Sequence, residues 1–505
     1  MSEGDARLRV HTVRGLFWSG IQRTGGQAIG LAAFIVLSRL LPPSTFGLLA
    51  LANVYLLVAL LFVEQGVSQA IIQRREVSPE HLDAAFSLSL ALAALLTLLT
   101  VALAGPLAQV FNEPTLEPVL RWLSVTLLLS GLRATQAAVL QRQLRFRELA
   151  VRTTVAESIG GTVGIAMAVA GMGVWSLVGQ AVARSLAGVV VLWRVSDWRP
   201  HLKFGLRPVR DITRFGLPVL GDRLVWLVQG KADDLVIGLV LGATALGYYS
   251  VGYRMLTYVT MLLAGTIQAV ALPVLSLLQQ DLGRFRHTFL TMLHYLALGA
   301  FPVFVGIAVV SPDIVPVLFG PQWAPSVPVM QVLALAGAAK ILPLATGTAL
   351  VARGHPGLQL RLNLVTTLLA VLGYVAVVGR GIVAVASVHL IVGLLVIPLH
   401  AGLLRSVFDI RPRAYFSAIR TAALGVILMS AVLLALTAAR GAPPPSFLWL
   451  AIVVVAGAAT YLGATYWLDR GSYDRARRAL REGILAGPGS AVSDLGLEGL
   501  AGPSP

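Results

Sequence analysis

Charged side chains interrupt the apolar stretches of this sequence at positions where a charge is costly. Seven basic and five acidic residues lie deep in such stretches. They are Arg23, Arg133, Arg184, Arg223, Lys231, Arg254 and Lys340, and Glu64, Glu157, Asp222, Asp233 and Asp234. Each costs roughly 2.5–3.5 kcal/mol at the centre of a bilayer, so most must face water or one another. The basic excess favours an anionic ligand, because arginine binds phosphate oxygens through paired hydrogen bonds.

Some of these charges have an opposite charge nearby in the sequence. Asp222 adjoins Arg223, and Lys231 lies shortly before Asp233 and Asp234. Ion pairs that fix helix packing are therefore the alternative to a ligand role for these five residues.

Arg254 and Lys340 have no acid one helical turn away on either side. Helical rise places them ~12 Å and ~20 Å inside the outer face of the membrane. We therefore predict that both bind an anion. The other five basic residues are assigned to the same site, with contact to cytoplasmic water as the alternative for Arg23 and Arg133.

Two acids within the apolar stretches are candidates for carrying a coupling ion, because transport against a gradient without ATP needs one. They are Glu157 and Asp222, with ion pairs to Arg184 or Arg223 as the alternative. The histidines are scattered, so we predict His389 as a hydrogen-bonded core residue and expect no metal site.

The composition indicates a membrane protein. Of 505 residues, 57% are hydrophobic and 12% are charged, with a mean hydropathy of +0.81, whereas a soluble domain has about 25% charged residues. Cysteine is absent, which excludes disulfides and Cys-ligated metals. The sequence contains no G-x-x-x-x-G-K-[ST] phosphate loop and no H-E-x-x-H motif. We therefore predict no cofactor and no enzyme activity.

Fourteen apolar stretches are long enough to cross a bilayer, which takes roughly 20 residues. They cover residues 15–40, 47–72, 82–104, 116–140, 148–170, 174–194, 209–238, 246–277, 287–310, 326–352, 359–378, 382–404, 415–438 and 447–467. The pattern predicts an all-α polytopic membrane protein.

The basic residues between these stretches predict the orientation. Twenty-eight of the 39 Lys and Arg fall in one alternating set of loops and ends, and only Arg39, Arg380 and Arg440 fall in the other. Basic loops stay on the cytoplasmic side. Both termini are therefore expected in the cytoplasm, and the net charge of +16 reflects topology rather than nucleic-acid binding.

Two pairs of segments about 200 residues apart resemble each other. Gly47 and Gly247 each begin a helix after similar residues, and Phe111 and Phe319 lie in a second similar pair. Six stretches per repeat place two lobes around an axis along the membrane normal, with the binding site between them; chance similarity is the alternative. The predicted organisation is a cytoplasmic N-terminus 1–14, an N-lobe 15–194, a basic linker 195–208, a C-lobe 209–404, two further helices in 415–467, and a partly disordered cytoplasmic tail 468–505.

Three segments resemble the polysaccharide transporter family of oligosaccharide-lipid flippases. They are KADDLVIGLVLGATALGYYSVGYRM, ESIGGTVGIAMAVAGMGVWSLVGQ and ALPVLSLLQQDLGRFR, within a similarity over residues 10–420. The resemblance implies a two-lobed bundle of fourteen helices and carriage of a polyprenyl-pyrophosphate-linked oligosaccharide. Arg254 matches an arginine that related lipid II flippases place in a central cavity. Arg23 is the nearest candidate for their first-helix arginine, but it lies closer to the cytoplasm.

The sequence therefore predicts a flippase of the bacterial inner membrane that exports lipid-linked sugar for O-antigen, capsule or exopolysaccharide by alternating access. Gln27, Gln136 and Asn363 are the predicted sugar contacts. Membrane lipids and the lipid-linked oligosaccharide are the expected partners, with polysaccharide polymerase and chain-length proteins as further ones. The alternatives are a cation-coupled multidrug exporter of the same superfamily and a membrane-embedded glycosyltransferase or polymerase.

Overall fold

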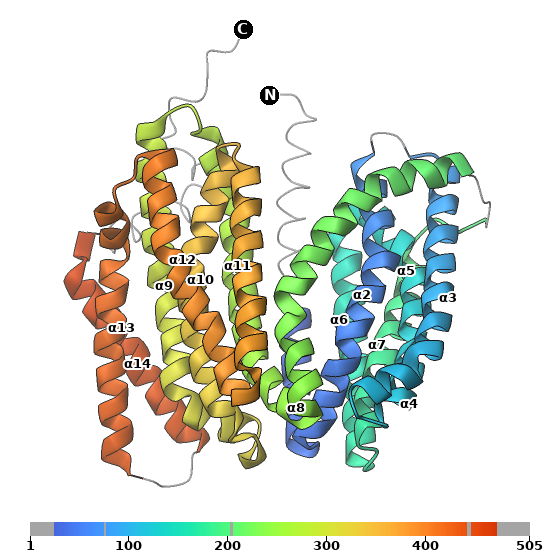
Figure 1. Ribbon diagram of the computed structural model, residues 1–505, viewed down its shortest axis with the longest axis horizontal. Coiled ribbons are helices and arrows are strands. Elements are labelled where there is room, and N and C mark those ends of the chain that lie inside the picture. Colours follow the sequence, from blue (N-terminus) through green and yellow to red (C-terminus); the bar gives the residue numbers. More distant parts are fainter. Residues whose placement is uncertain (1–24, 75–76, 202–205, 442–445, 472–505) are drawn as a thin grey trace. The chain divides into compact units, whose positions relative to one another are not determined.

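The structure is a computed structural model that describes residues 25–74, 77–201, 206–441 and 446–471, except for the side chains of residues 65–67, 70, 206–219, 222 and 262–270. Every regular element in these ranges is a helix (Figure 1). They are the helix Gly25–Leu40, α2 (Pro43–Gln73), α3 (Pro79–Val110), α4 (Leu116–Leu123), α5 (Val125–Arg142), α6 (Phe146–Val169), α7 (Val174–Val195), α8 (Leu206–Leu277), α9 (Leu282–Leu318), η1 (Pro321–Trp323), α10 (Ser326–Ala352), α11 (Pro356–Val377), η2 (Val378–Arg380), α12 (Ile382–Phe408), α13 (Pro412–Arg440) and α14 (Phe447–Leu468).

Eleven of the described helical segments are long and apolar enough to span a membrane, which confirms the all-α polytopic class. The difference from fourteen predicted stretches has three causes. α8 counts once, although Gly242 has a φ of 78° and separates two helical arms that match the stretches 209–238 and 246–277. α6 is present but carries charges such as Arg152 and Glu157. The first stretch is described only from Gly25 onward.

The described chain divides into two compact units. Unit 1 takes its described residues from Met1–Gly265, Ser311–Gly337 and Pro356–Val396, and unit 2 from Thr266–Val310, Ala338–His355 and Ile397–Pro505. The limits of the units fall inside α8, α9, α10 and α12, so they differ from the limits of the predicted lobes. The division into two six-helix lobes remains a prediction.

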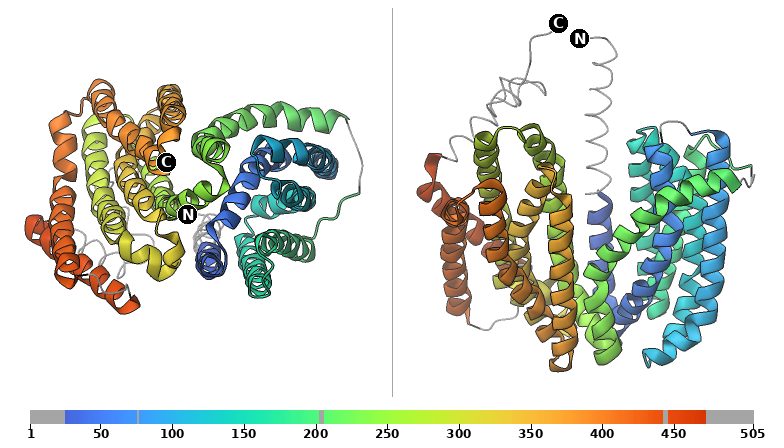
Figure 2. Two further views of the ribbon diagram at one scale, coloured as in Figure 1. Left: turned by 60° about the horizontal axis from the view of Figure 1, so that its bottom comes forward. Right: turned by 45° about the horizontal axis from the view of Figure 1, so that its top comes forward.

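Within unit 1, α5 packs against both α2 and α3, and α6 runs along α7, as can be followed in Figure 2. Glycine lets α6 approach its neighbours. A Cβ at Gly160 would lie 2.7 Å from Cβ of Arg184 on α7, and one at Gly26 would lie 2.6 Å from Cγ2 of Thr153 on α6. Both distances are too short for a side chain, so small residues at these places permit the close helix contacts.

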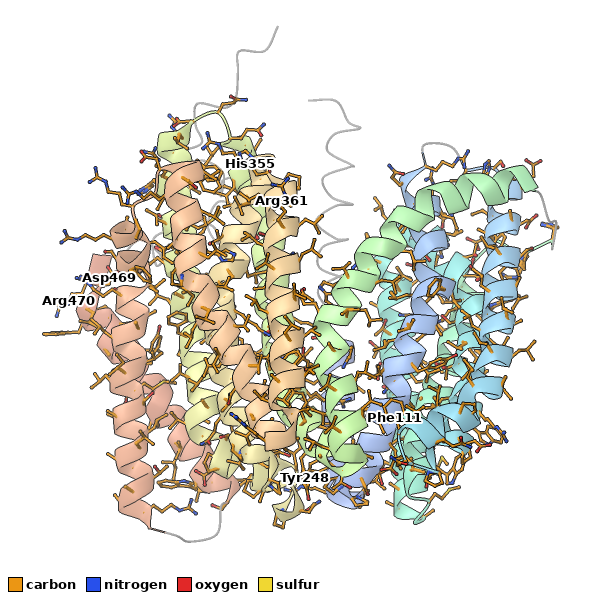
Figure 3. All side chains as sticks on the ribbon, in the orientation of Figure 1. Phe111, Tyr248, His355, Arg361, Asp469 and Arg470 are labelled. Carbon is orange, nitrogen blue, oxygen red and sulfur yellow. The ribbon has the colours of Figure 1, made fainter. Side chains whose placement is uncertain are left out.

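The backbones of α2 and α8 also touch in unit 1. A Cβ at Gly47 would overlap the carbonyl oxygen of Ala243, and a Cβ at Gly247 would overlap that of Pro43. This contact lies where α8 bends, near the start of α2 (Figure 1). Figure 3 shows Phe111 and Tyr248 toward this end of unit 1 and Arg361 toward the opposite end.

In unit 2, α13 and α14 pack on each other through Gly425, where a Cβ would lie 2.7 Å from Cγ2 of Thr465. Tyr461 of α14 donates a hydrogen bond of 2.9 Å to the carbonyl of Leu298 on α9. Arg286 of α9 donates at 2.7 Å to Asp409, which follows α12. The two last helices are thus attached to the helices that precede them in the chain.

Candidate functional site

Arg254, the first of the predicted anion-binding residues, lies partly buried in the second arm of α8. Its guanidinium carbon lies 4.0 Å from the ring centre of Phe34, which is buried in the helix Gly25–Leu40. Among the described residues Arg254 forms no ion pair. The aromatic ring therefore holds the guanidinium in place by a cation–π contact, and no acid of the described part of the chain occupies the hydrogen-bond donors of Arg254.

Arg184 and Glu157 lie close to Arg254, and the charges of both act on it. Nη1 of Arg184 on α7 and Oε1 of Glu157 on α6 are 3.5 Å apart, and the two side chains are 47% and 22% exposed. The structure therefore shows the ion pair between Glu157 and Arg184 that the sequence analysis gave as the alternative. Charges that are this exposed in helices of membrane-spanning length require water around them.

A second ion pair extends this charged region. Arg133 of α5 pairs with Glu64 of α2, which also accepts a hydrogen bond from Ser130. The charges of Arg133, Glu64 and Glu157 all act on Arg152 of α6.

We call the six residues Glu64, Arg133, Arg152, Glu157, Arg184 and Arg254 the basic cluster. Its four arginines and two glutamates leave two positive charges uncompensated. Arg152, which is not among the predicted anion-binding residues, lies in the second turn of α6, and its buried Nε lacks a partner among the described residues.

Lys231, whose side chain is 31% exposed, belongs to a different network, whose other members are buried. Its Nζ lies 2.5 Å from Oδ2 of Asp234. Asp233, 1% exposed, accepts hydrogen bonds from the hydroxyl of Tyr249 at 2.7 Å and from Nε2 of His389 at 3.0 Å. His389 is 4% exposed and also contacts the hydroxyl of Tyr374 at 3.1 Å. His389 is therefore a hydrogen-bonded core residue, as predicted. Lys231 forms an ion pair with Asp234, which was the alternative to a ligand role for Lys231.

The structure places the remaining predicted basic residues separately. Lys340 lies half-buried in α10 within unit 2, and it is not free of partners. Arg223 lies half-buried in the first arm of α8. Arg23 and the side chain of Asp222 lie outside the described residues.

The predicted sugar contacts differ in environment. The amide nitrogen of Gln27 contacts the sulfur of Met261 at 3.7 Å, and Asn363 accepts a hydrogen bond of 3.0 Å from Gln359. Gln136 of α5 is 1% exposed, and neither its amide nitrogen nor its amide oxygen has a partner among the described residues. In the described part of the chain, no group of His, Cys, Asp and Glu is arranged to hold a metal ion.

Comparisons with known proteins agree with this architecture. Residues 36–328 match the profile of a family described as "Polysaccharide biosynthesis protein". The lipopolysaccharide biosynthesis protein WzxC of Escherichia coli is 27% identical over 368 residues, which cover 72% of this chain and 74% of WzxC. The teichuronic acid biosynthesis protein TuaB of Bacillus subtilis is 28% identical over 437 residues, which cover 85% of this chain and 89% of TuaB. The lipid II flippase MurJ in an inward closed conformation shares the fold, with a TM-score of 0.74 at 14% identity over 90% of this chain and 98% of the MurJ chain.

Proposed function

This chain belongs to the family of polysaccharide biosynthesis proteins, and on that premise we propose that it is a flippase for a polyprenyl-pyrophosphate-linked oligosaccharide. The substrate passes from the inner to the outer leaflet of the bacterial inner membrane and supplies a surface polysaccharide. Two relatives whose names concern lipopolysaccharide and teichuronic acid support the substrate class, because both products are polysaccharides.

The observation that carries the proposal is the basic cluster around Arg254. A pyrophosphate brings two or more negative charges, and the cluster has two positive charges that its own glutamates leave uncompensated. Arg254 offers a planar fork of donors, which matches phosphate oxygens better than a point charge does. A cation-coupled drug exporter would instead need an acidic or apolar site.

The remaining assignments complete the proposal. Lys340 and Arg223 are further phosphate contacts, and Gln27, Gln136 and Asn363 contact the sugar. Alternating access moves the substrate, both termini face the cytoplasm, and a coupling ion on Glu157 or Asp222 supplies the driving force. Polysaccharide polymerase and chain-length proteins receive the product.

Complementation of surface polysaccharide in a strain that lacks this chain tests the proposal. Arg254→Ala should reduce export at least tenfold, because each charge-assisted hydrogen bond contributes on the order of 1.5–3 kcal/mol. Arg254→Lys should recover part of it. The control is Arg440→Ala, since Arg440 also lies over an aromatic ring, that of Trp449 at 4.5 Å, but at the end of α13. Full export with Arg254→Ala, at normal expression and insertion, would exclude the phosphate role of Arg254.

A further inference from the structure

Glu157 is the acid that faces the most exposed arginine of the basic cluster. It pairs with Arg184 at 3.5 Å, and its charge acts on both Arg152 and Arg254. A single carboxylate therefore offsets part of the positive charge of three arginines. The other glutamate of the cluster, Glu64, is occupied by Arg133 and Ser130.

Glu157 is held loosely. Hydrogen-bonded ion pairs lie at about 2.7–2.9 Å, whereas its oxygen and the Arg184 nitrogen are 3.5 Å apart, and no further polar group among the described residues holds it. By contrast, Glu148 on the same helix lies 3.0 Å from Arg145. A carboxylate with one long contact and 22% exposure can leave its partner at little cost.

The carboxylate of Glu157 lies beside two glycines, Gly26 and Gly30, of a neighbouring helix. Oε2 of Glu157 lies 3.5 Å from the position that a Cβ on Gly30 would take, and its Cγ lies 4.0 Å from that position on Gly26. The helix that carries these glycines also carries Phe34, the ring under Arg254. The carboxylate therefore lies among the same three elements, the helix Gly25–Leu40, α6 and α7, that border the exposed donors of Arg184.

We infer that Glu157 is an exchangeable counter-ion, which neutralises the arginines in the empty protein and is displaced when the phosphate of the substrate binds. This inference rests on the proposed function. A phosphate oxygen and a carboxylate oxygen compete for the same guanidinium groups, and like charges repel one another at short range. Glu157 therefore weakens substrate binding, and it assists release because it returns to Arg184 as the phosphate leaves.

Binding of undecaprenyl pyrophosphate to the purified full-length protein in lipid nanodiscs tests the inference, with undecaprenol as the ligand that lacks phosphate. Glu157→Gln should bind undecaprenyl pyrophosphate roughly fivefold more tightly than wild type, the size expected for a partly exposed ion pair. Export in cells should fall at the same time, because release slows. Glu157→Asp keeps the negative charge on a shorter side chain, so its affinity for undecaprenyl pyrophosphate should lie between those of wild type and Glu157→Gln.

The matched control is Glu148→Gln, which removes a glutamate paired with arginine at the N-terminal end of α6, outside the cluster. Its binding should equal that of wild type. Unchanged or weaker binding by folded Glu157→Gln, with Arg254→Ala still weakening binding, overturns the inference and leaves the proposed function intact. If undecaprenyl pyrophosphate and undecaprenol bind alike, or Arg254→Ala binds as wild type does, the phosphate site itself is refuted. Should Glu157→Gln fail to fold, Glu157→Asp decides, since its binding must still exceed that of wild type.

Discussion

Gly47 of α2 contacts α8 close to Gly247, and Gly247 of α8 contacts α2 close to Gly47. Gly47 lies against the carbonyl of Ala243, four residues before Gly247, and Gly247 lies against the carbonyl of Pro43, four residues before Gly47. A contact that repeats after exchange of residues 200 apart is what a local two-fold axis produces. The finding supports an internal repeat at these positions, where the alternative from the sequence was chance similarity.

Substitution at this crossing should be costly. Gly47→Ala or Gly247→Ala forces the two backbones apart, and overpacking of this kind destabilises by about 1–3 kcal/mol. Thermal unfolding in detergent measures the effect. Gly463→Ala in α14 is the control, since a Cβ there meets nothing within 4 Å and should not destabilise. The double variant should lose less than the sum of the two, because both changes break one contact; full additivity would contradict a shared crossing.

The orientation can be measured with introduced cysteines, because the chain has none of its own. Ala324 follows η1 on the predicted outer side, and Gln143 follows α5 on the predicted inner side; both are exposed. In intact spheroplasts an impermeant maleimide should label Ala324→Cys and leave Gln143→Cys unlabelled until the membrane is opened. Labelling of both in intact spheroplasts would contradict the predicted topology.

The network around Asp233 should be important for stability. His389→Ala removes a hydrogen-bonded partner from a carboxylate that is 1% exposed, and breaking a buried pair in this way costs about 3–5 kcal/mol. Thermal unfolding should show a large loss, part of which the double variant Asp233→Asn/His389→Gln regains through an amide hydrogen bond. The control is His201→Ala, whose imidazole is 68% exposed beside Asp83 and should contribute little. Equal losses of stability in His389→Ala and His201→Ala would show that burial of the network adds nothing to its contribution.

Substitution of Gln136 can distinguish a structural role of this residue from a role in sugar binding. A buried polar group without a partner costs about 1–3 kcal/mol, so Gln136→Met should raise the unfolding temperature. If Gln136 contacts the sugar, the same variant should also export less polysaccharide at equal expression. A more stable variant with normal export would remove Gln136 from the predicted sugar contacts.

The helices could be predicted from the sequence because hydropathy depends on local composition. The stretch 382–404 corresponds to α12, Ile382–Phe408, and the break predicted after residue 238 occurs at Gly242, whose positive φ suits glycine.

The partners of the charges were harder to predict, because they depend on distant residues. His389 lies 156 residues from Asp233, so no pattern along the chain joins them. Phe34 lies 220 residues before Arg254 and is one apolar residue among many. The ion pair between Glu157 and Arg184 was foreseen as the alternative to a coupling role for Glu157. The position of this carboxylate beside Gly26 and Gly30 of another helix depends on the fold and could not be read from the sequence.

The carbonyl of Ser38 accepts hydrogen bonds from Nε1 of Trp323 at 2.8 Å and from Nε2 of Gln322 at 2.9 Å. Ser38 lies in the last turn of its helix, where carbonyls have no partner within the helix. Trp323 is made 285 residues later, which at 5–20 residues per second is roughly 15–60 s of synthesis. The end of the helix Gly25–Leu40 that carries Ser38 therefore lacks these two donors when it is made, and it gains them only after more than half of the chain has been synthesised.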